Sequence, residues 1–181
     1  MRGLASQATT MGFSALDGLM MGTRSGALDA GVLLHLLRQG WDADRIEDLL
    51  YRRSGLLGVS GQTSDMRRLR SSARPEARRA IRLFTHRVVR EAGAMVACVG
   101  GLDVLAFTGG IGEHDVDLRA EVCERLAYLG VRLDPARNAR ACGDEALRIS
   151  APGSTAEVWV VPTDEGRMAA EAVARMLGQD R

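Results

Sequence analysis

The stretch DVLAFTGGIGEH, residues 103–114, decides the fold that the sequence predicts. Its apolar run over residues 103–107 does not alternate with polar residues, which is typical of a strand buried on both faces of a sheet. The glycines that follow indicate a turn, and the apolar spacing beyond them predicts a helix that ends at Gly130.

A second apolar run, EVWVV at residues 157–161, repeats this pattern and leads into a last helix through residues 168–176. Strands that alternate with helices predict an α/β domain with a largely parallel sheet. Ligands of such sheets bind beyond the carboxyl ends of the strands. We therefore expect TGGIGE, residues 108–113, and PTDE, residues 162–165, to share the functional edge.

Upstream of this region the pattern is helical. Asp29 is predicted to cap a helix that runs to Gly40, and Asp42 to cap another that stops at Gly55. Residues 55–69, GLLGVSGQTSDMRRL, are expected to form a loop that turns into a helix near Ser64. The longest helix opens at Pro75 or Glu76 and continues to Val99, and its arginines are interpreted as a solvated face. Those arginines are Arg78, Arg79, Arg82 and Arg90.

The residue types alone leave two interpretations of each motif open. TGGIGE is either a tight turn without a ligand or a loop whose amides approach a phosphate or sugar at a helix start. Glu165 either favours the positive end of the last helix or holds Mg²⁺ directly or through water. Spacing alone favours the helix-end interpretation.

Arg24 lies in MGFSALDGLMMGTRSG, residues 11–26, which gathers glycines and methionines around one arginine. Clustered glycines indicate positive φ angles or a close backbone approach, and a solvated surface arginine does not need that setting. A guanidinium there can hold a carboxylate or a phosphoryl group through two hydrogen bonds. The sequence therefore predicts an anion-binding loop at Arg24.

The composition and the charge of the chain exclude several classes of function. The 181 residues fit a single domain, here 1–181, and 46% of them are hydrophobic, enough for a sizeable core. A formal net charge of +1 argues against nucleic acid as a partner. Without a signal peptide or a run of about 18 apolar residues, no membrane partner is expected, and the predicted location is the cytoplasm. The three cysteines are expected to be buried free thiols, and the three histidines have no metal-binding spacing.

Five segments together resemble the acetate kinase family, which includes propionate and butyrate kinases. They are MGFSALDGLMMGTRSG, LLGVSGQTSDMR, FTGGIGEH, LDPARNAR and VPTDEG, in this order. The resemblance implies the C-terminal actin-like (ribonuclease H-like) domain of the acetate and sugar kinase/Hsp70/actin superfamily, truncated at its first hairpin. On that basis SQATT, residues 6–10, is expected to be the tail of a strand.

The resemblance also implies roles for particular residues. Arg24 would stabilise the phosphoryl group in flight, in a reaction that moves the γ-phosphate of ATP reversibly to a short-chain carboxylate, acetate or propionate. Glu165 would bind Mg²⁺, and the family implies ATP/ADP and the carboxylate as partners and a homodimer. Two segments would bind the nucleotide: Ser64, Asp65, Met66 and Arg67, and then Gly109, Gly110, Ile111, Gly112 and Glu113.

The sequence also departs from the family pattern. Members are roughly twice as long, and the half that carries their catalytic aspartate and glycine-rich phosphate loop is not matched here. His114 stands where an asparagine is usual, Gly166 where a second acidic residue is common, and Ala27 and Ala30 replace Asp and Pro. Two hypotheses therefore compete: a kinase of this family, or a non-catalytic remnant that binds nucleotide weakly or serves as a dimerisation module.

Overall fold

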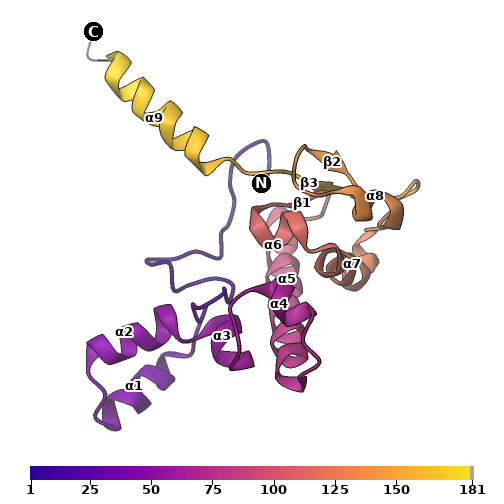
Figure 1. Ribbon diagram of the computed structural model, residues 1–181. Coiled ribbons are helices and arrows are strands. Elements are labelled where there is room, and N and C mark those ends of the chain that lie inside the picture. The colour runs from indigo at the N-terminus through magenta and orange to yellow at the C-terminus, as the bar shows by residue number, and fades with distance from the viewer. Residues whose placement is uncertain (180–181) are drawn as a thin grey trace.

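The computed structural model describes residues 1–179, apart from the side chains at positions 165, 167, 168, 178 and 179. Its sheet has the strand order β1-β3-β2 (Figure 1). Strand β1 (Val104–Phe107) runs parallel to β3 (Glu157–Val160), and β2 (Leu147–Arg148) runs antiparallel to β3. The parallel pair predicted from the two apolar runs is confirmed, whereas β2 was not predicted.

The predicted burial of β1 on both faces is wrong. Strand β1 lies at an edge of the sheet, and of its four residues only Phe107 is buried, while the side chain of Val104 is 54% exposed. Strand β3 has neighbours on both sides, yet it alternates, with Val158 and Val160 buried. A short apolar run without alternation thus did not distinguish an edge strand from a central one.

Two helices near the N-terminus begin where the sequence predicts. The carboxylate of Asp29 accepts a hydrogen bond from the Gly31 amide at 2.7 Å and starts α1 (Ala30–Arg38). Asp42 starts α2 (Ala43–Arg52) through the Arg45 amide at 2.8 Å. Such caps satisfy amides that have no partner within the helix.

Gly55 does not end α2, contrary to the prediction. Helix α2 ends at Arg52, and Gly55 instead begins a further short helix, α3 (Gly55–Ser60), within the segment predicted to be a loop. Gly55 has φ +61°, and a Cβ atom there would lie 2.2 Å from the carbonyl oxygen of Met21. The glycine is needed for this close approach of the 20–25 segment, rather than as a helix stop.

The longest helix, α5 (Pro75–Val99), has the predicted extent and the predicted exposed arginines. TGGIGEH forms a short helix rather than an open loop. Residues 6–10 form no strand, so the expectation for SQATT is wrong. The other helices are α4 (Met66–Arg70), α6 (Gly109–His114), α7 (Val116–Arg125), the 3-10 turn η1 (Ala127–Leu129), α8 (Pro135–Arg140) and α9 (Glu165–Gln179).

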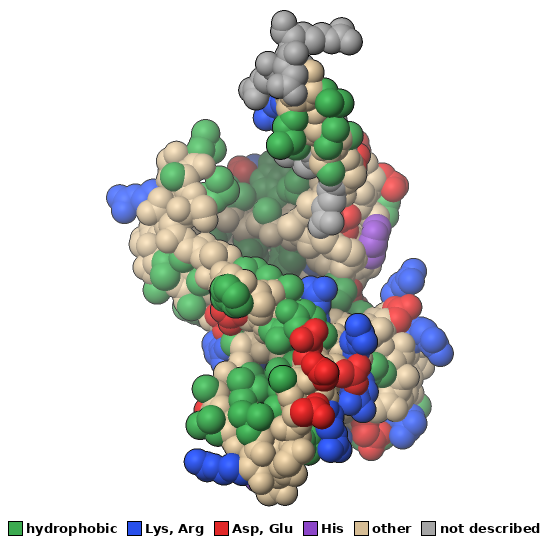
Figure 2. Space-filling view, turned by 90° about the vertical axis from the view of Figure 1, so that its left-hand side faces the viewer, with side chains coloured by type: hydrophobic (Ala, Val, Ile, Leu, Met, Phe, Trp, Pro, Cys, Tyr) green, Lys and Arg blue, Asp and Glu red, His purple; other side chains and the backbone are tan. Residues whose placement is uncertain are grey.

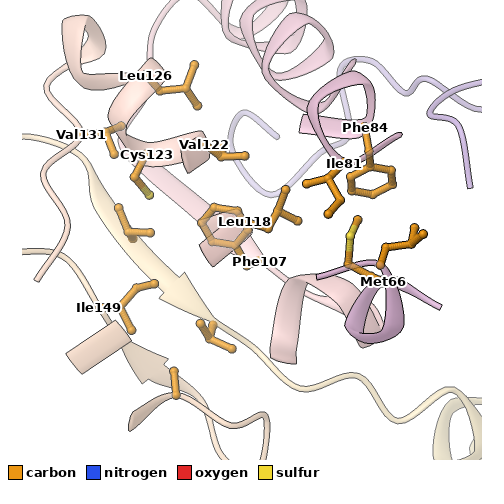
Figure 3. Packing of buried hydrophobic residues seen from close by; sticks show 14 of the residues in the cluster. Met66, Ile81, Phe84, Phe107, Leu118, Val122, Cys123, Leu126, Val131 and Ile149 are labelled. Carbon is orange, nitrogen blue, oxygen red and sulfur yellow. The ribbon is translucent and has the colours of Figure 1, made fainter. Parts of the chain in front are cut away.

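The core lies where α5 meets α3, α4 and α7 and where α7 covers the sheet. Figure 3 shows Phe107 of β1 beside Leu118 of α7, with Ile81 and Phe84 of α5 facing them. Burying each such side chain contributes roughly 1.5–3 kcal/mol. This cluster fixes the carboxyl end of β1, from which the glycine-rich turn departs.

Helices α1 and α9 lie outside this core. Helix α9 projects away from the rest of the molecule (Figure 1), and α1 contains no buried residue. Hydrophobic side chains appear among charged ones on the face that α1 and α2 present (Figure 2), and Leu34 and Leu37 are about half exposed. Within residues 1–179, no helix has both the length and the apolarity needed to cross a bilayer.

The prediction of three buried thiols holds for Cys123 alone. Cys123 belongs to α7 and is 2% exposed, and burial raises the pKa of its thiol to about 12. Cys98 and Cys142 are exposed. Cys98 sits in the last turn of α5, which extends beyond the core, so the helical apolar setting did not imply burial.

Candidate functional site

A hollow of about 590 Å³ lies between the start of α4 and the short helix α6, at the carboxyl end of β1. It joins two segments that are more than 40 residues apart in the sequence and that were both predicted to bind nucleotide. Its lining residues are Ser64, Asp65, Met66, Arg67, Arg70, Gly110, Ile111, His114, Asp115, Val116 and Asp117.

The lining combines three kinds of chemistry. Met66, Ile111 and Val116 supply apolar surface on which a flat ring can lie. Arg67 and Arg70 supply guanidinium donors that suit phosphate oxygens. Carboxylates such as Asp65 can accept hydrogen bonds from sugar hydroxyls. A ring, a sugar and phosphates are the parts of a nucleotide.

Asp65 sets the geometry of the first segment. Its carboxylate accepts from the Arg67 amide at 2.9 Å and so begins α4. The Arg67 guanidinium pairs with the same carboxylate at 3.4 Å, and these hydrogen bonds from Arg67 hold the pKa of Asp65 below its ordinary value. Because the Arg67 side chain is 87% exposed, this pair contributes little to stability, and the guanidinium is available to a ligand.

Arg70 is a lining residue that the sequence did not reveal. Its Nε donates to Asp115 at 3.2 Å and its Nη1 donates to Glu121 at 2.7 Å. Burial alone would lower the pKa of Arg70, but these two carboxylates outweigh it and raise the pKa. Among the described residues the buried Nη2 atom has no hydrogen-bond partner. Only the proximity of Arg70 to the TSDMR motif could have indicated it.

The glycines of α6 have different functions. Gly109 has φ +72°, a left-handed conformation that favours glycine. Gly110 lines the hollow, and a Cβ atom there would meet no protein atom within 4 Å. Gly112 faces the protein, since a Cβ atom there would lie 3.5 Å from the backbone of Phe107. Of the predicted GGIGE loop, only Gly110 and Ile111 therefore line the hollow.

Glu113 is 7% exposed, and its carboxylate points into the protein rather than lining the hollow. Its Oε1 atom accepts from the Gly109 amide at 2.7 Å, and from the amide and the hydroxyl of Thr163 at 3.0 and 2.9 Å. Burial acts to raise the pKa of Glu113, but the hydrogen bonds from Thr163 and Gly109 prevail and lower it. Glu113 thus ties the glycine turn after β1 to the PTDE turn after β3, as the shared edge predicts.

A buried arginine of α7 supports the end of α6, and no sequence motif indicated this arginine. Arg119 of α7 has no exposed surface and donates to the carbonyl oxygens of Gly112 and Glu113 at 2.9 and 2.7 Å. It also donates to Asn138 and Ala141 at the end of α8. These bonds satisfy carbonyl groups that the last turn of a short helix leaves without partners.

Arg24 does not line this hollow, but its loop touches it. A Cβ atom at Gly22 would lie 3.1 Å from the Cβ of Ser64, which does line the hollow. The Arg24 guanidinium lies 3.9 Å from the Met21 sulfur and 5.8 Å from the centre of the Tyr51 ring. Both of these neighbours are uncharged, and the anion-binding role of Arg24 stays a prediction.

The predicted metal ligand Glu165 is the first residue of α9, but its side chain lies outside the described part of the structure. Among the side chains that are described, no three of His, Cys, Asp and Glu gather as a metal site. Mg²⁺ that enters with nucleotide phosphates needs only one or two protein carboxylates, and the PTDE turn carries two acidic residues.

Three comparisons relate this chain to known proteins. The sequence model of the acetokinase family matches residues 1–171. The acetate kinase of Rhodopseudomonas palustris (strain TIE-1) is 58% identical over 172 residues, which cover 94% of this chain and 43% of the relative. The chain therefore spans less than half the length of this relative.

Solved structures agree with the sequence comparison. The crystal structure of Porphyromonas gingivalis acetate kinase matches with a TM-score of 0.85 and 39% identity, over 93% of this chain and 43% of that one. A propionate kinase from Francisella tularensis matches with a TM-score of 0.77 and 35% identity, over 86% of this chain and 40% of the other.

Proposed function

Because the chain belongs to the acetokinase family, we propose that it is the nucleotide-binding C-terminal part of a kinase that forms acyl phosphates. The predicted fold class, part of an actin-like α/β domain, agrees with its acetate and propionate kinase neighbours. In the proposed reaction the γ-phosphate of ATP moves reversibly to a short-chain carboxylate, acetate or propionate. Residues 1–181 are proposed to be one domain of that enzyme.

One observation carries the proposal: the segments at residues 64–67 and 109–113 meet at a single hollow whose lining suits a nucleotide. The adenine ring would lie on Ile111 and Met66, and the sugar hydroxyls would donate to Asp65. Arg67 and Arg70 would meet the phosphates. These contacts bind and orient the nucleotide, which supplies much of the catalysis in phosphoryl transfer.

Arg24 is proposed to act on the other reactant. Its loop borders the hollow at Ser64, and its guanidinium lies beside Met21 and Tyr51. As the phosphoryl group moves, charge spreads over its equatorial oxygens, and a guanidinium can hold two of them at once. Glu165 is proposed to hold the Mg²⁺ that accompanies ATP, and Mg²⁺ would neutralise charge on the phosphates. Glu113 would position the PTDE turn, which leads to Glu165, through its hydrogen bonds with Thr163.

Calorimetry of ADP binding to the 181-residue chain tests the proposed site. We expect a dissociation constant in the high micromolar to millimolar range, about −4 to −6 kcal/mol, because part of the family's length is not in this chain. Arg67→Ala and Gly110→Val should each abolish binding. The exposed neighbour Arg68, which does not line the hollow, provides the matched control Arg68→Ala.

Gly110→Val is the sharper of the two variants. Since a Cβ atom at Gly110 meets no protein atom, the valine should leave the melting temperature nearly unchanged while filling the hollow. ADP binding that survives both Gly110→Val and Arg67→Ala would show that the site assignment is wrong.

A further inference from the structure

A second hollow, of about 560 Å³, lies between the loop at residues 20–25, the start of α3 and the middle of α5. This volume is within the range of pockets that hold small molecules. Its lining residues are Met20, Ser25, Arg53, Ser54, Gly55, Gly58, Val59, Leu83, His86, Arg87 and Arg90. None of them lines the nucleotide hollow.

Positive charge gathers on one side of this second hollow. Leu83, His86, Arg87 and Arg90 recur at helical spacing and so share one face of α5. Together with Arg53 they bring three guanidinium groups and an imidazole to the lining, and no carboxylate is among the described residues that line it.

The positive charges of the three arginines are offset to different extents by neighbouring carboxylates. Arg53 pairs with Asp48 at 2.6 Å, and Arg90 pairs with Glu91, but both arginine side chains are at least half exposed, so solvent weakens these pairs. Arg87 is partly buried, and its Nη2 donates to a neutral group, the carbonyl oxygen of Ala27, at 2.7 Å. That bond orients the guanidinium without neutralising it.

The other side of the hollow is apolar. Met20 is almost fully buried, and Val59 and Leu83 complete the surface beside it. A cationic half and an apolar half together suit a ligand with the same two parts. Inorganic phosphate alone would leave the apolar half empty, because the hollow is much larger than that ion.

From this arrangement we propose that the second hollow binds a small phosphomonoester. Its phosphate meets Arg87, Arg90 and His86, and its organic part lies on Met20, Val59 and Leu83. Guanidinium groups bind phosphate through two parallel hydrogen bonds, which favours phosphate over a singly charged ligand of the same size.

The site is coupled to the loop that carries Arg24. Met20 and Ser25 of that loop line the second hollow, while Gly22 of the same loop packs against Ser64 of the nucleotide hollow. A ligand held by Met20 and Ser25 therefore contacts the loop between the two sites. The phosphomonoester site itself does not depend on the proposed kinase activity.

Nuclear magnetic resonance of the histidine ring protons tests the proposal on the 181-residue chain. The sequence has three histidines, of which His86 lines the second hollow, His114 lines the nucleotide hollow and His35 lines neither. Titration with phenyl phosphate should move the His86 signal to saturation. Inorganic phosphate should move it at clearly higher concentration, because it makes no apolar contact.

Variants of α5 complete the test. Arg87→Gln should raise the dissociation constant for phenyl phosphate at least about tenfold, as expected for a lost hydrogen bond to a charged group. Arg90→Gln, at an exposed position, should also weaken binding. It replaces Arg87→Gln as the test variant if Arg87→Gln disturbs folding. Arg82→Gln makes the same charge change on the same helix outside the lining and should leave binding unchanged.

Three results would overturn the proposal. The first is a His86 signal that does not saturate with phenyl phosphate, including the case in which only His114 moves. The second is equal affinity for inorganic and phenyl phosphate, and the third is equal weakening by Arg82→Gln and Arg90→Gln. Because His114 reports the nucleotide hollow separately, failure here is distinguishable from failure of the proposed function.

Discussion

Replacing Arg119 with methionine should destabilise the whole chain by disrupting the support of α6. The side chain is fully buried and makes five hydrogen bonds, to the carbonyl oxygens of Gly112, Glu113, Asn138 and Ala141 and to the Asn138 side chain. Methionine has a similar length but cannot donate, so all of these buried acceptors lose a partner at once.

The magnitude follows from the number and kind of the lost bonds. A hydrogen bond to a charged group contributes about 1.5–3 kcal/mol, and such bonds within one network are not additive. Burying the guanidinium also has a cost, seen in the lowered pKa of Arg119, which methionine avoids. Each buried acceptor left without a donor costs about 1–3 kcal/mol, so the loss of several at once, less the burial cost that methionine avoids, should destabilise the chain by about 3–5 kcal/mol. For a chain of this size that corresponds to a melting temperature lower by about 6–20 °C.

Thermal melts followed by circular dichroism measure this effect. Arg125→Met on the same helix provides the control, because Arg125 is exposed and its replacement should change stability by less than about 0.5 kcal/mol. A melting temperature for Arg119→Met within about 2 °C of the Arg125→Met control would refute the assignment of Arg119 as the support of α6.

Three further predictions concern the chemistry. In a hydroxamate assay with acetate and MgATP, the 181-residue chain alone should show no acyl kinase turnover, because the resemblance places the catalytic aspartate outside it; turnover near that of a full-length family enzyme would contradict this. In a protein restored to the full family length, Arg24→Lys should lower kcat at least about 10²-fold, nearly as much as Arg24→Ala. The reason is that lysine lacks the planar guanidinium, which can hold two oxygen atoms at once. A near-normal kcat with lysine would remove Arg24 from the catalytic residues. Because the pKa of Glu113 is lowered from 4.5, its stabilising effect is present above that pH and is lost on acidification, so Glu113→Gln should flatten the fall in melting temperature below about pH 4.5. An unchanged slope would show that Glu113 is not the titrating group.

The sequence predicted the features that depend on local chemistry. Asp29 and Asp42 cap helices because a carboxylate two or three residues ahead of a free amide can reach it without help from the rest of the fold. The parallel pairing of β1 and β3 followed from strands that alternate with helices. Each cap lies within a few residues of the amide that it satisfies, and each strand is visible in its own short apolar run.

The features that were missed depend on contacts between distant segments. The exposure of Val104 is decided by which strands lie beside β1, and an apolar run does not contain that information. The same holds for Gly55, whose neighbour is the Met21 carbonyl. Arg70 and Arg119 looked like ordinary helix arginines, because their partners lie 6 to 51 residues away.

The candidate site also combines features that the sequence predicted with features that depend on contacts between distant segments. The motifs at residues 64–67 and 109–113 were found in the sequence, and the structure brings them together. Which of their residues face the hollow could not be predicted, since that depends on the short helix α6. As a result, Glu113 and Gly112 face the protein, while His114 and Asp115 join the lining.

Hydrogen–deuterium exchange of the 181-residue chain, with and without ADP, tests most directly whether the two motifs form one nucleotide site. At about 10 mM ADP, tenfold above a millimolar dissociation constant, exchange should slow together in residues 64–70 and 109–117. Exchange in α1 and α2, which do not line the hollow, should stay unchanged. Slowing in only one of the two segments, or in neither, would contradict the account.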